Sequence, residues 1–209
     1  MLTTEVRKIS DRKVRVLFDD GLSLVLYRAE AGKLGIRAGE DISDDTVRYI
    51  LDDILRKRSR LRCLNLLKTS DRTVKQLRER LAMDGYPEET ISQALDYVAS
   101  YHYTDDFRYA CNYVRLMSGR KSGRQIEYEL LRKGVDRNLI RAALSEDEDQ
   151  MGDAQTQAIM SLARKRGYDS EHAGREETMK FIRYLLGKGF DLPAIHTAVG
   201  SSAGREYLD

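Results

Sequence analysis

Hydrophobic positions recur in the same order three times along the chain, within segments of equal length that align without gaps. The segments are Val74–Leu95, Gly123–Leu144 and Thr178–Val199. In each, two apolar residues stand four positions apart, a glycine follows after four more, and a second apolar pair closes the segment. Because residues four apart share one face of a helix, the pattern predicts a helix, a tight turn and a second helix in every copy.

The glycine at the shared position of each copy is predicted to end the first helix of that copy. Gly85, Gly134 and Gly189 occupy this position. Glycine adopts the left-handed backbone conformation that ends many helices without a steric penalty. We expect the next residue to fold back onto the apolar residue four positions before the glycine. These next residues are all large and apolar, namely Tyr86, Val135 and Phe190.

A third amphipathic stretch precedes each helix pair, so each unit is predicted to be a three-helix module. In the first unit we expect Leu61, Leu64 and Leu67 to form the buried stripe of this helix. Repeated modules build long surfaces that contact large partners more often than they build one deep catalytic pocket. The matching apolar residues of the other units are Phe107, Ala110, Val114 and Met117, and then Ala158, Leu162 and Ala163.

The N-terminal residues follow a different pattern, in which polar and apolar positions alternate. Lys13–Phe18 and Leu22–Tyr27 read as strands, and Asp19–Gly21 between them reads as a turn, which together indicate a β-hairpin. An isolated hairpin is only marginally stable in water. We therefore expect it to gain a third strand from Glu5–Ile9, or to pack on the predicted helix Val47–Arg60.

The predicted fold class is mainly α. It is a tandem array of three three-helix modules, preceded by a small N-terminal β-hairpin and a helix. We expect an acidic linker between the second and third modules. The predicted boundaries are 1–40 for the hairpin region, 41–60 for the linking helix, 61–104, 105–146 and 153–200 for the modules, 147–152 for the linker and 201–209 for a tail.

The composition is typical of a helical protein with a solvated surface. The chain has 209 residues, of which 33% are charged, and a net charge of only +2. No apolar segment is long enough to span a bilayer, and residues 1–10 lack the apolar core of a signal peptide. We therefore expect a cytoplasmic monomer with no membrane partner. Cys63 and Cys111 are then expected to be free thiols, since disulfides are rare in that compartment.

The sequence contains no complete catalytic or ligand-binding motif. Gly119–Gly123 resembles part of a phosphate-binding loop, but the preceding strand and the earlier glycine are missing. Glu146–Asp149 lacks the glycine and the spaced oxygen ligands of a calcium loop. His102, His172 and His196 do not share the spacing of metal ligands. We therefore expect no enzyme activity, no metal and no cofactor.

Basic residues gather around the turn between the first two helices of the central module. Any one of these residues is explained equally well by an exposed, solvated helix face or by a contact with a partner. The cluster as a whole, however, is denser than a solvated face requires. Its natural partners are phosphates or an acidic protein surface. The candidate contact residues are Arg115, Arg120, Lys121 and Arg124 from this cluster, with Arg132, Lys133 and Lys188 from positions close to the glycines of the second and third copies.

The central module also resembles the RecX family of bacterial regulatory proteins. Tyr103–Asp106 is similar to that family's Tyr-x-Asp-Asp motif, and the helix after it carries the expected aromatic and small residues. The resemblance spans roughly Leu61 to Gly200, with Thr104 in place of an apolar residue and a longer insert at Arg166–Glu177. The other matching positions are Tyr109, Ala110, Tyr113, Val114, Gly119, Gly123, Ile126, Leu130, Lys133, Gly134 and Val135.

The resemblance implies a non-enzymatic negative regulator of the recombinase RecA. Such a protein binds the RecA–DNA filament along its helical groove and inhibits the ATPase, strand-exchange and coprotease activities of RecA. It would contact single- or double-stranded DNA weakly or through the filament, and so modulate recombination, DNA repair and the SOS response. Capping, groove blockage and filament disassembly are all compatible with the sequence. The alternative is a direct DNA-binding helical-repeat protein, since three-helix units can dock in a DNA groove; a helical scaffold for another partner is a further reading.

Overall fold

The computed structural model describes residues 1–146 and 148–200, and the chain divides into two compact units, Met1–Asp105 and Asp106–Asp209. Most of the described residues are helical, and a small sheet lies at the N-terminus. The predicted tail, 201–209, and residue 147 of the predicted linker lie outside the described residues. The mainly α fold class predicted from the repeat is confirmed.

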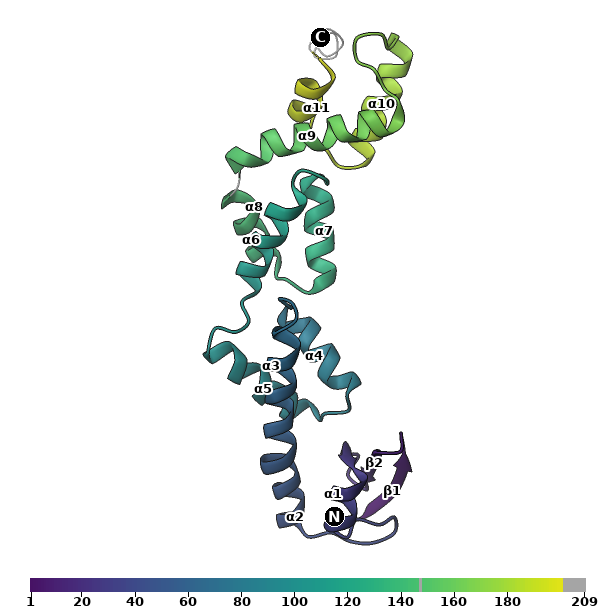
Figure 1. Cartoon of the computed structure of the whole chain (residues 1–209), viewed down its shortest axis with the longest axis vertical. Helices are drawn as coiled ribbons and strands as arrows, with labels where there is room; N and C mark the ends of the chain where they lie inside the picture. The colour runs from purple at the N-terminus through teal and green to yellow at the C-terminus, as the bar shows by residue number, and fades with distance from the viewer. Residues whose placement is uncertain (147, 201–209) are drawn as a thin grey trace. The chain divides into compact units, whose positions relative to one another are not determined.

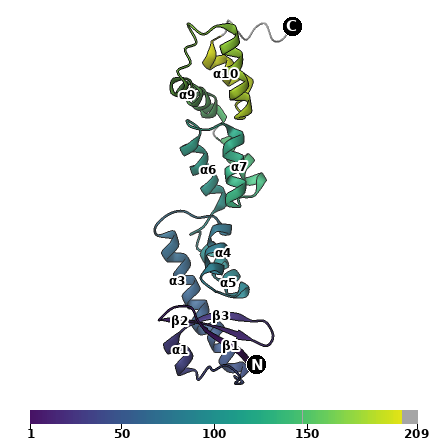
Figure 2. The same cartoon turned by 90° about the vertical axis from the view of Figure 1, so that its right-hand side faces the viewer.

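The N-terminal hairpin gains a third strand, which is one of the two possibilities that the sequence left open. Strands β1 (Thr3–Lys8), β2 (Lys13–Phe18) and β3 (Ser23–Tyr27) form an antiparallel sheet in the order β1-β2-β3. A short helix that the sequence analysis did not predict, α1 (Arg28–Lys33), follows β3 and packs against the sheet (Figure 2). Its Ala31 is buried with the apolar residues of the sheet, so this helix completes the N-terminal core.

A continuous helical segment leads from the N-terminal core into the first module. It comprises α2 (Asp44–Tyr49), a π-helical turn η1 (Ile50–Leu55) and α3 (Arg56–Leu67), which follow one another without a break (Figure 1). The boundary that we expected between 60 and 61 therefore falls inside a helix. The physical reason is that one helix serves two cores: Ile50 and Leu55 are buried with the sheet, and Cys63 and Leu66 are buried in the first module.

The first module consists of α3, α4 (Val74–Met83) and α5 (Glu88–Ser100), around one apolar core. The prediction for its first helix was wrong at one position. Leu61 is 61% exposed, because the buried face of α3 runs through Cys63 and Leu66 instead. Residues spaced by three drift around a helix, so Leu61 lies off the buried face although Leu64 and Leu67 pack against the core.

The second unit contains two further three-helix modules, each with its own core. The second module consists of α6 (Asp106–Met117), α7 (Gly123–Lys133) and α8 (Arg137–Glu146). The third consists of α9 (Glu148–Arg166), α10 (Arg175–Gly187) and α11 (Leu192–Val199), which Figure 1 shows at the green and yellow end of the chain. Residues 148–152, which we expected to be a linker, form the first part of α9.

The repeated glycines end their helices in the left-handed conformation. Their φ angles are +87° at Gly85, +90° at Gly134 and +84° at Gly189. In each copy the next residue donates its backbone N–H to the carbonyl of the apolar residue four before the glycine, which is the fold-back contact that the sequence indicated. These bonds join Tyr86 to Leu81 (3.2 Å), Val135 to Leu130 (3.1 Å) and Phe190 to Leu185 (3.2 Å).

Two of these glycine turns also approach a neighbouring element closely. A Cβ atom added at Gly85 would overlap Val25 Cγ2 and lie 3.1 Å from Val25 Cβ on strand β3. A Cβ added at Gly189 would lie 2.8 Å from Arg124 Cβ and 3.2 Å from Ser122 Oγ on the second module. The first turn therefore packs against the N-terminal sheet, and the third turn packs against the start of α7.

The described residues contain no candidate membrane-spanning helix, no disulfide and no candidate metal-binding cluster. None of the described helices is long and apolar enough to cross a bilayer. Cys63 and Cys111 are not joined by a disulfide, and burial of Cys63 raises the pKa of its thiol to about 11. Among the described side chains, no group of three or more His, Cys, Asp or Glu residues could hold a metal ion.

Candidate partner-binding surface

The turn between α6 and α7 is held by a capping box at the start of α7. The backbone N–H of Gln125 donates to Ser122 Oγ at 3.3 Å, and the backbone N–H of Ser122 donates to Gln125 Oε1 at 3.2 Å. The backbone N–H groups of Arg120 and Lys121 both bond to the carbonyl of Met117 at 2.9 Å. This turn fixes the backbone from which the central basic side chains extend.

Lys121 forms a bidentate ion pair within the second module. Its Nζ lies 2.6 Å from both carboxylate oxygens of Glu129 on α7. The hydroxyl of Tyr113 on α6 donates to the same carboxylate, and the Lys133 ammonium lies 5.3 Å from the centre of the Tyr113 ring. The charge of Lys121 is therefore partly balanced inside the protein, so this residue is a weaker candidate contact than its position in the sequence indicated.

These contacts shift the pKa of both acidic groups in the network. The hydrogen bonds from Lys121 and then Tyr113 lower the pKa of Glu129. Burial of the phenol, followed by its hydrogen bond to Glu129, raises the pKa of Tyr113. The carboxylate is thus held ionised and the phenol protonated, which keeps α6 and α7 joined at neutral pH.

The second module is expected to lose stability in acid, because Glu129 then becomes protonated and loses its ion pair with Lys121. Because the folded pKa of Glu129 lies below the unfolded value of about 4.3, its contribution is present above that pH and is lost as the pH falls through the folded pKa. The pair is partly exposed, so we expect a loss of at most about 1 kcal/mol. Urea unfolding should show a smaller stability difference between wild type and Glu129→Gln at about pH 3 than at neutral pH. An equal difference at both pH values would contradict this role.

A groove between the second and third modules gathers two other predicted residues. It has a volume of about 350 Å³ and includes Arg124 at the start of α7 and Lys188 at the end of α10. The modules are tied together beside it, since Ser122 Oγ donates to the carbonyl of Lys188 at 2.6 Å. The complete lining is Arg124, Gln125, Tyr128, Glu129, Leu186, Gly187, Lys188 and Gly189.

Aromatic rings accompany the basic side chains of this region. The Arg132 guanidinium lies 5.9 Å from the centre of the Tyr128 ring on the same helix. The Tyr184 ring has the guanidinium of Arg166 at 3.6 Å and the ammonium of Lys188 at 5.4 Å. Cations over aromatic faces are held in place while their remaining donors stay available to a partner.

The structure thus separates the predicted residues into groups. Arg124 and Lys188 line one groove, whereas Lys121 and Lys133 both contact the Tyr113–Glu129 pair. Arg132 lies over Tyr128. Arg115 lies in the last turn of α6, and Arg120 lies in the turn after that helix; both are exposed and neither lines the groove.

The aromatic and acidic partners of these cations were not predicted from the sequence. Tyr128 stands four residues before Arg132, and Tyr184 stands four before Lys188, so the helical spacing could have revealed both pairs. Glu129 and Arg166 could not be found in that way, because each meets its partner across a turn or from another helix.

Two segments of the chain match models of known protein domains. Residues 60–97 match the first three-helix domain of RecX, and residues 105–144 match its second three-helix domain. These ranges correspond to the first two modules of the fold. The basic turn and most of the candidate contact residues therefore lie within the second matched domain.

Curated relatives and solved structures are similar over a greater length. The chain is 25% identical over 209 residues to the regulatory protein RecX of Clostridium botulinum strain Alaska E43, covering 98% of this chain and 97% of the relative. It is 27% identical to that of Clostridioides difficile strain 630, covering 91% and 90%. A crystal structure of regulatory protein RecX aligns with a TM-score of 0.62 at 18% identity, covering 95% of this chain and 98% of that one. RecX from Lactobacillus salivarius aligns with a TM-score of 0.60 at 26% identity, covering 69% and 94%.

Proposed function

Because the chain belongs to the RecX family, we propose that it is a negative regulator of RecA that binds the RecA–DNA filament along its groove. In this role it inhibits the ATPase, strand-exchange and coprotease activities of RecA, and it modulates recombination and DNA repair without catalysing a reaction itself. The observation that carries the proposal is the full-length similarity to proteins named regulatory protein RecX, centred on two tandem three-helix domains.

The tandem modules supply a physical reason why this fold suits a filament. A filament groove presents the same protein surface repeatedly, so several modest contacts on linked modules can form at once. Once one module has bound, the others act at a high effective concentration, and the combined affinity exceeds that of any single contact. Separate cores in the modules allow each to present its own surface to the filament.

The groove that contains Arg124 and Lys188 is the contact site that the geometry supports best. Its two cations come from different modules, and neither makes an ion pair with any residue in the described part of the chain. Such cations keep their charge available to acidic groups of a filament or to DNA phosphates. Arg115, Arg120 and Arg132 would extend the same basic character along α6 and α7.

Sedimentation with RecA-coated single-stranded DNA tests the proposal against the direct DNA-binding alternative. The regulator is expected to sediment with the coated DNA and to bind bare duplex DNA of the same length much more weakly. The alternative predicts tight binding to bare duplex that falls steeply as salt is raised, with no gain when RecA is present. That second pattern would overturn the proposal.

A further inference from the structure

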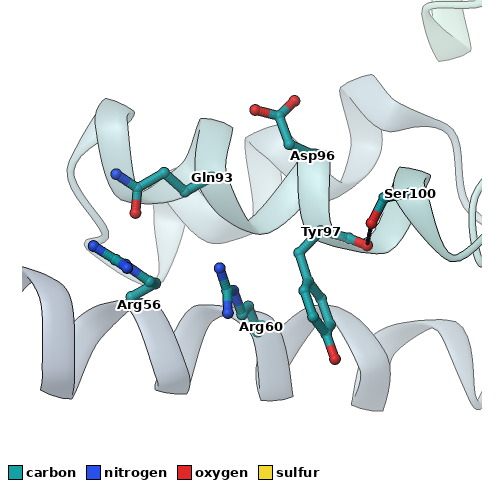
Figure 3. A pocket seen from close by; sticks show the side chains of 6 residues that line it. All are labelled: Arg56, Arg60, Gln93, Asp96, Tyr97 and Ser100. Carbon is teal, nitrogen blue, oxygen red and sulfur yellow. Dashed lines mark hydrogen bonds between the residues drawn. The ribbon is translucent and has the colours of Figure 1, made fainter.

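Three tyrosine rings follow one another along the first unit. The first of them, Tyr97, lines a groove between α3 and α5 (Figure 3). The ring of Tyr97 lies 5.0 Å from that of Tyr101, which lies 5.9 Å from that of Tyr103. Tyr101 and Tyr103 are 59% and 49% exposed, although each is large and aromatic. The groove has a volume of about 470 Å³ and is lined by Arg56, Arg60, Gln93, Asp96, Tyr97 and Ser100.

Arginine side chains from α3 extend this row of rings. The Arg60 guanidinium lies over the Tyr97 ring, 4.6 Å from its centre. In Figure 3, Arg56 and Arg60 project from α3 toward α5, whereas the Asp96 carboxylate points away from both. The surface therefore presents cationic and aromatic groups together; the Asp96 carboxylate is directed elsewhere, and Arg56 is paired with Asp52 one turn before it.

Two arginine nitrogens at this surface are buried but have no hydrogen-bond partner among the described residues. They are the Nε atoms of Arg56 and Arg60 in the groove, although Nη2 of Arg56 forms an ion pair with Asp52. A buried donor without an acceptor costs free energy, which a bound acceptor would offset. Two such donors beside one row of rings point to a ligand that carries repeated acceptors.

The turn that holds the exposed rings is strained. His102, between Tyr101 and Tyr103, has a φ of +54°, and it is the one residue other than glycine with positive φ in the described part of the chain. The turn is closed by the backbone N–H of Tyr103, which donates to the carbonyl of Val98 at 2.9 Å. The repeat ends its helices with glycine, whereas this turn has a histidine in the left-handed conformation, which raises the free energy of the folded state. Strained residues of this kind cluster at functional sites.

We propose that this surface, formed by Tyr97, Tyr101 and Tyr103 with Arg56 and Arg60 and called here the tyrosine ladder, binds a single-stranded polynucleotide. Every base presents a flat π-face that stacks on an aromatic ring, and the arginines supply donors for successive phosphates. In a duplex the base faces are covered by their neighbours, so the ladder selects single strands. The inference does not depend on the action on RecA, because it concerns another unit of the chain and free nucleic acid.

Fluorescence anisotropy with a labelled oligo(dT) of about 20 nucleotides tests the tyrosine ladder directly. The wild type is expected to bind this probe more tightly than a duplex of equal length. Tyr101→Ala with Tyr103→Ala should weaken binding by roughly tenfold or more, since each stacked base contributes separately. Tyr101→Phe with Tyr103→Phe should retain binding, because stacking requires the ring and not the hydroxyl.

Two further variants separate stacking from charge. Tyr49→Ala removes a tyrosine of similar exposure (50%) from α2 and should leave binding unchanged. Arg60→Gln should weaken binding and reduce its dependence on salt by about one phosphate contact. All the variants are first checked for unchanged helicity by circular dichroism.

Unchanged oligo(dT) affinity in the folded double-alanine variant would overturn the inference, as would equal affinity of the wild type for duplex. Loss of binding to RecA-coated DNA without loss of oligo(dT) binding would assign the rings to a protein contact instead. The inhibition of RecA is measured in a separate assay, so failure of the ladder and failure of the regulatory role give different results.

Discussion

Replacing both Arg124 and Lys188 with glutamate is expected to weaken inhibition of RecA-driven ATP hydrolysis by about tenfold or more. The two cations line one groove between the second and third modules, so their reversal would place two anions against an acidic partner surface. Like charges at an interface raise the dissociation rate and suppress binding. The concentration of the variant that halves the rate of ATP hydrolysis, compared with that of the wild type, measures the effect.

The matched control for this variant reverses two arginines on the N-terminal sheet. Arg7 and Arg15 are exposed and face each other on β1 and β2, so Arg7→Glu with Arg15→Glu changes the net charge by the same amount. We expect this control to inhibit like the wild type. Equal weakening in both variants would mean that overall charge, and not the groove, determines inhibition.

Replacing Gly85 with alanine is expected to destabilise the first unit by about 3 kcal/mol. Two costs add at this position. The φ of +87° is unfavourable for any residue with a Cβ, and the new Cβ would overlap the side chain of Val25 on β3. The turn would have to move away from the sheet. The midpoint of unfolding in urea, followed by circular dichroism, measures the loss.

Gly39→Ala separates the two costs. Gly39 has a similar φ of +82°, but no atom lies within 4 Å of an added Cβ. This control carries the backbone strain alone and should lose only about 1 kcal/mol. If Gly85→Ala were no more destabilising than Gly39→Ala, the packing of the glycine turn against the sheet would not contribute to stability.

The repeat made most of the fold predictable, because its glycines and apolar pairs act through local physics. In each copy the glycine four residues after a buried apolar residue ends the helix, and Tyr86, Val135 and Phe190 each make the expected fold-back bond. The prediction failed where one helix serves two cores. The uninterrupted segment from α2 to α3 depends on the packing of Ile50 and Leu55 with the sheet, and the exposure of Leu61 depends on which face of α3 enters the core of the first module. No local pattern contains either contact.

The candidate site was less predictable, since its properties arise between helices. The sequence placed Lys121 in the basic cluster but did not show that Glu129, on the next helix, pairs with it. Lys188 and Arg124 lie far apart in the sequence and line one groove only because the Gly189 turn packs against Ser122. Similarly, Tyr97 and Tyr101 have helical spacing, but the stacking of Arg60 from α3 required the structure.

The rate of ATP hydrolysis by RecA on single-stranded DNA, titrated with this protein, tests the regulatory role most directly. The protein is added to preformed filaments with the DNA and ATP in excess. The rate is expected to fall progressively and to reach its minimum at substoichiometric or near-equimolar amounts, because each bound molecule spans part of the groove. A rate that stays unchanged up to a clear excess of the protein, with filaments of unchanged length, would contradict the account.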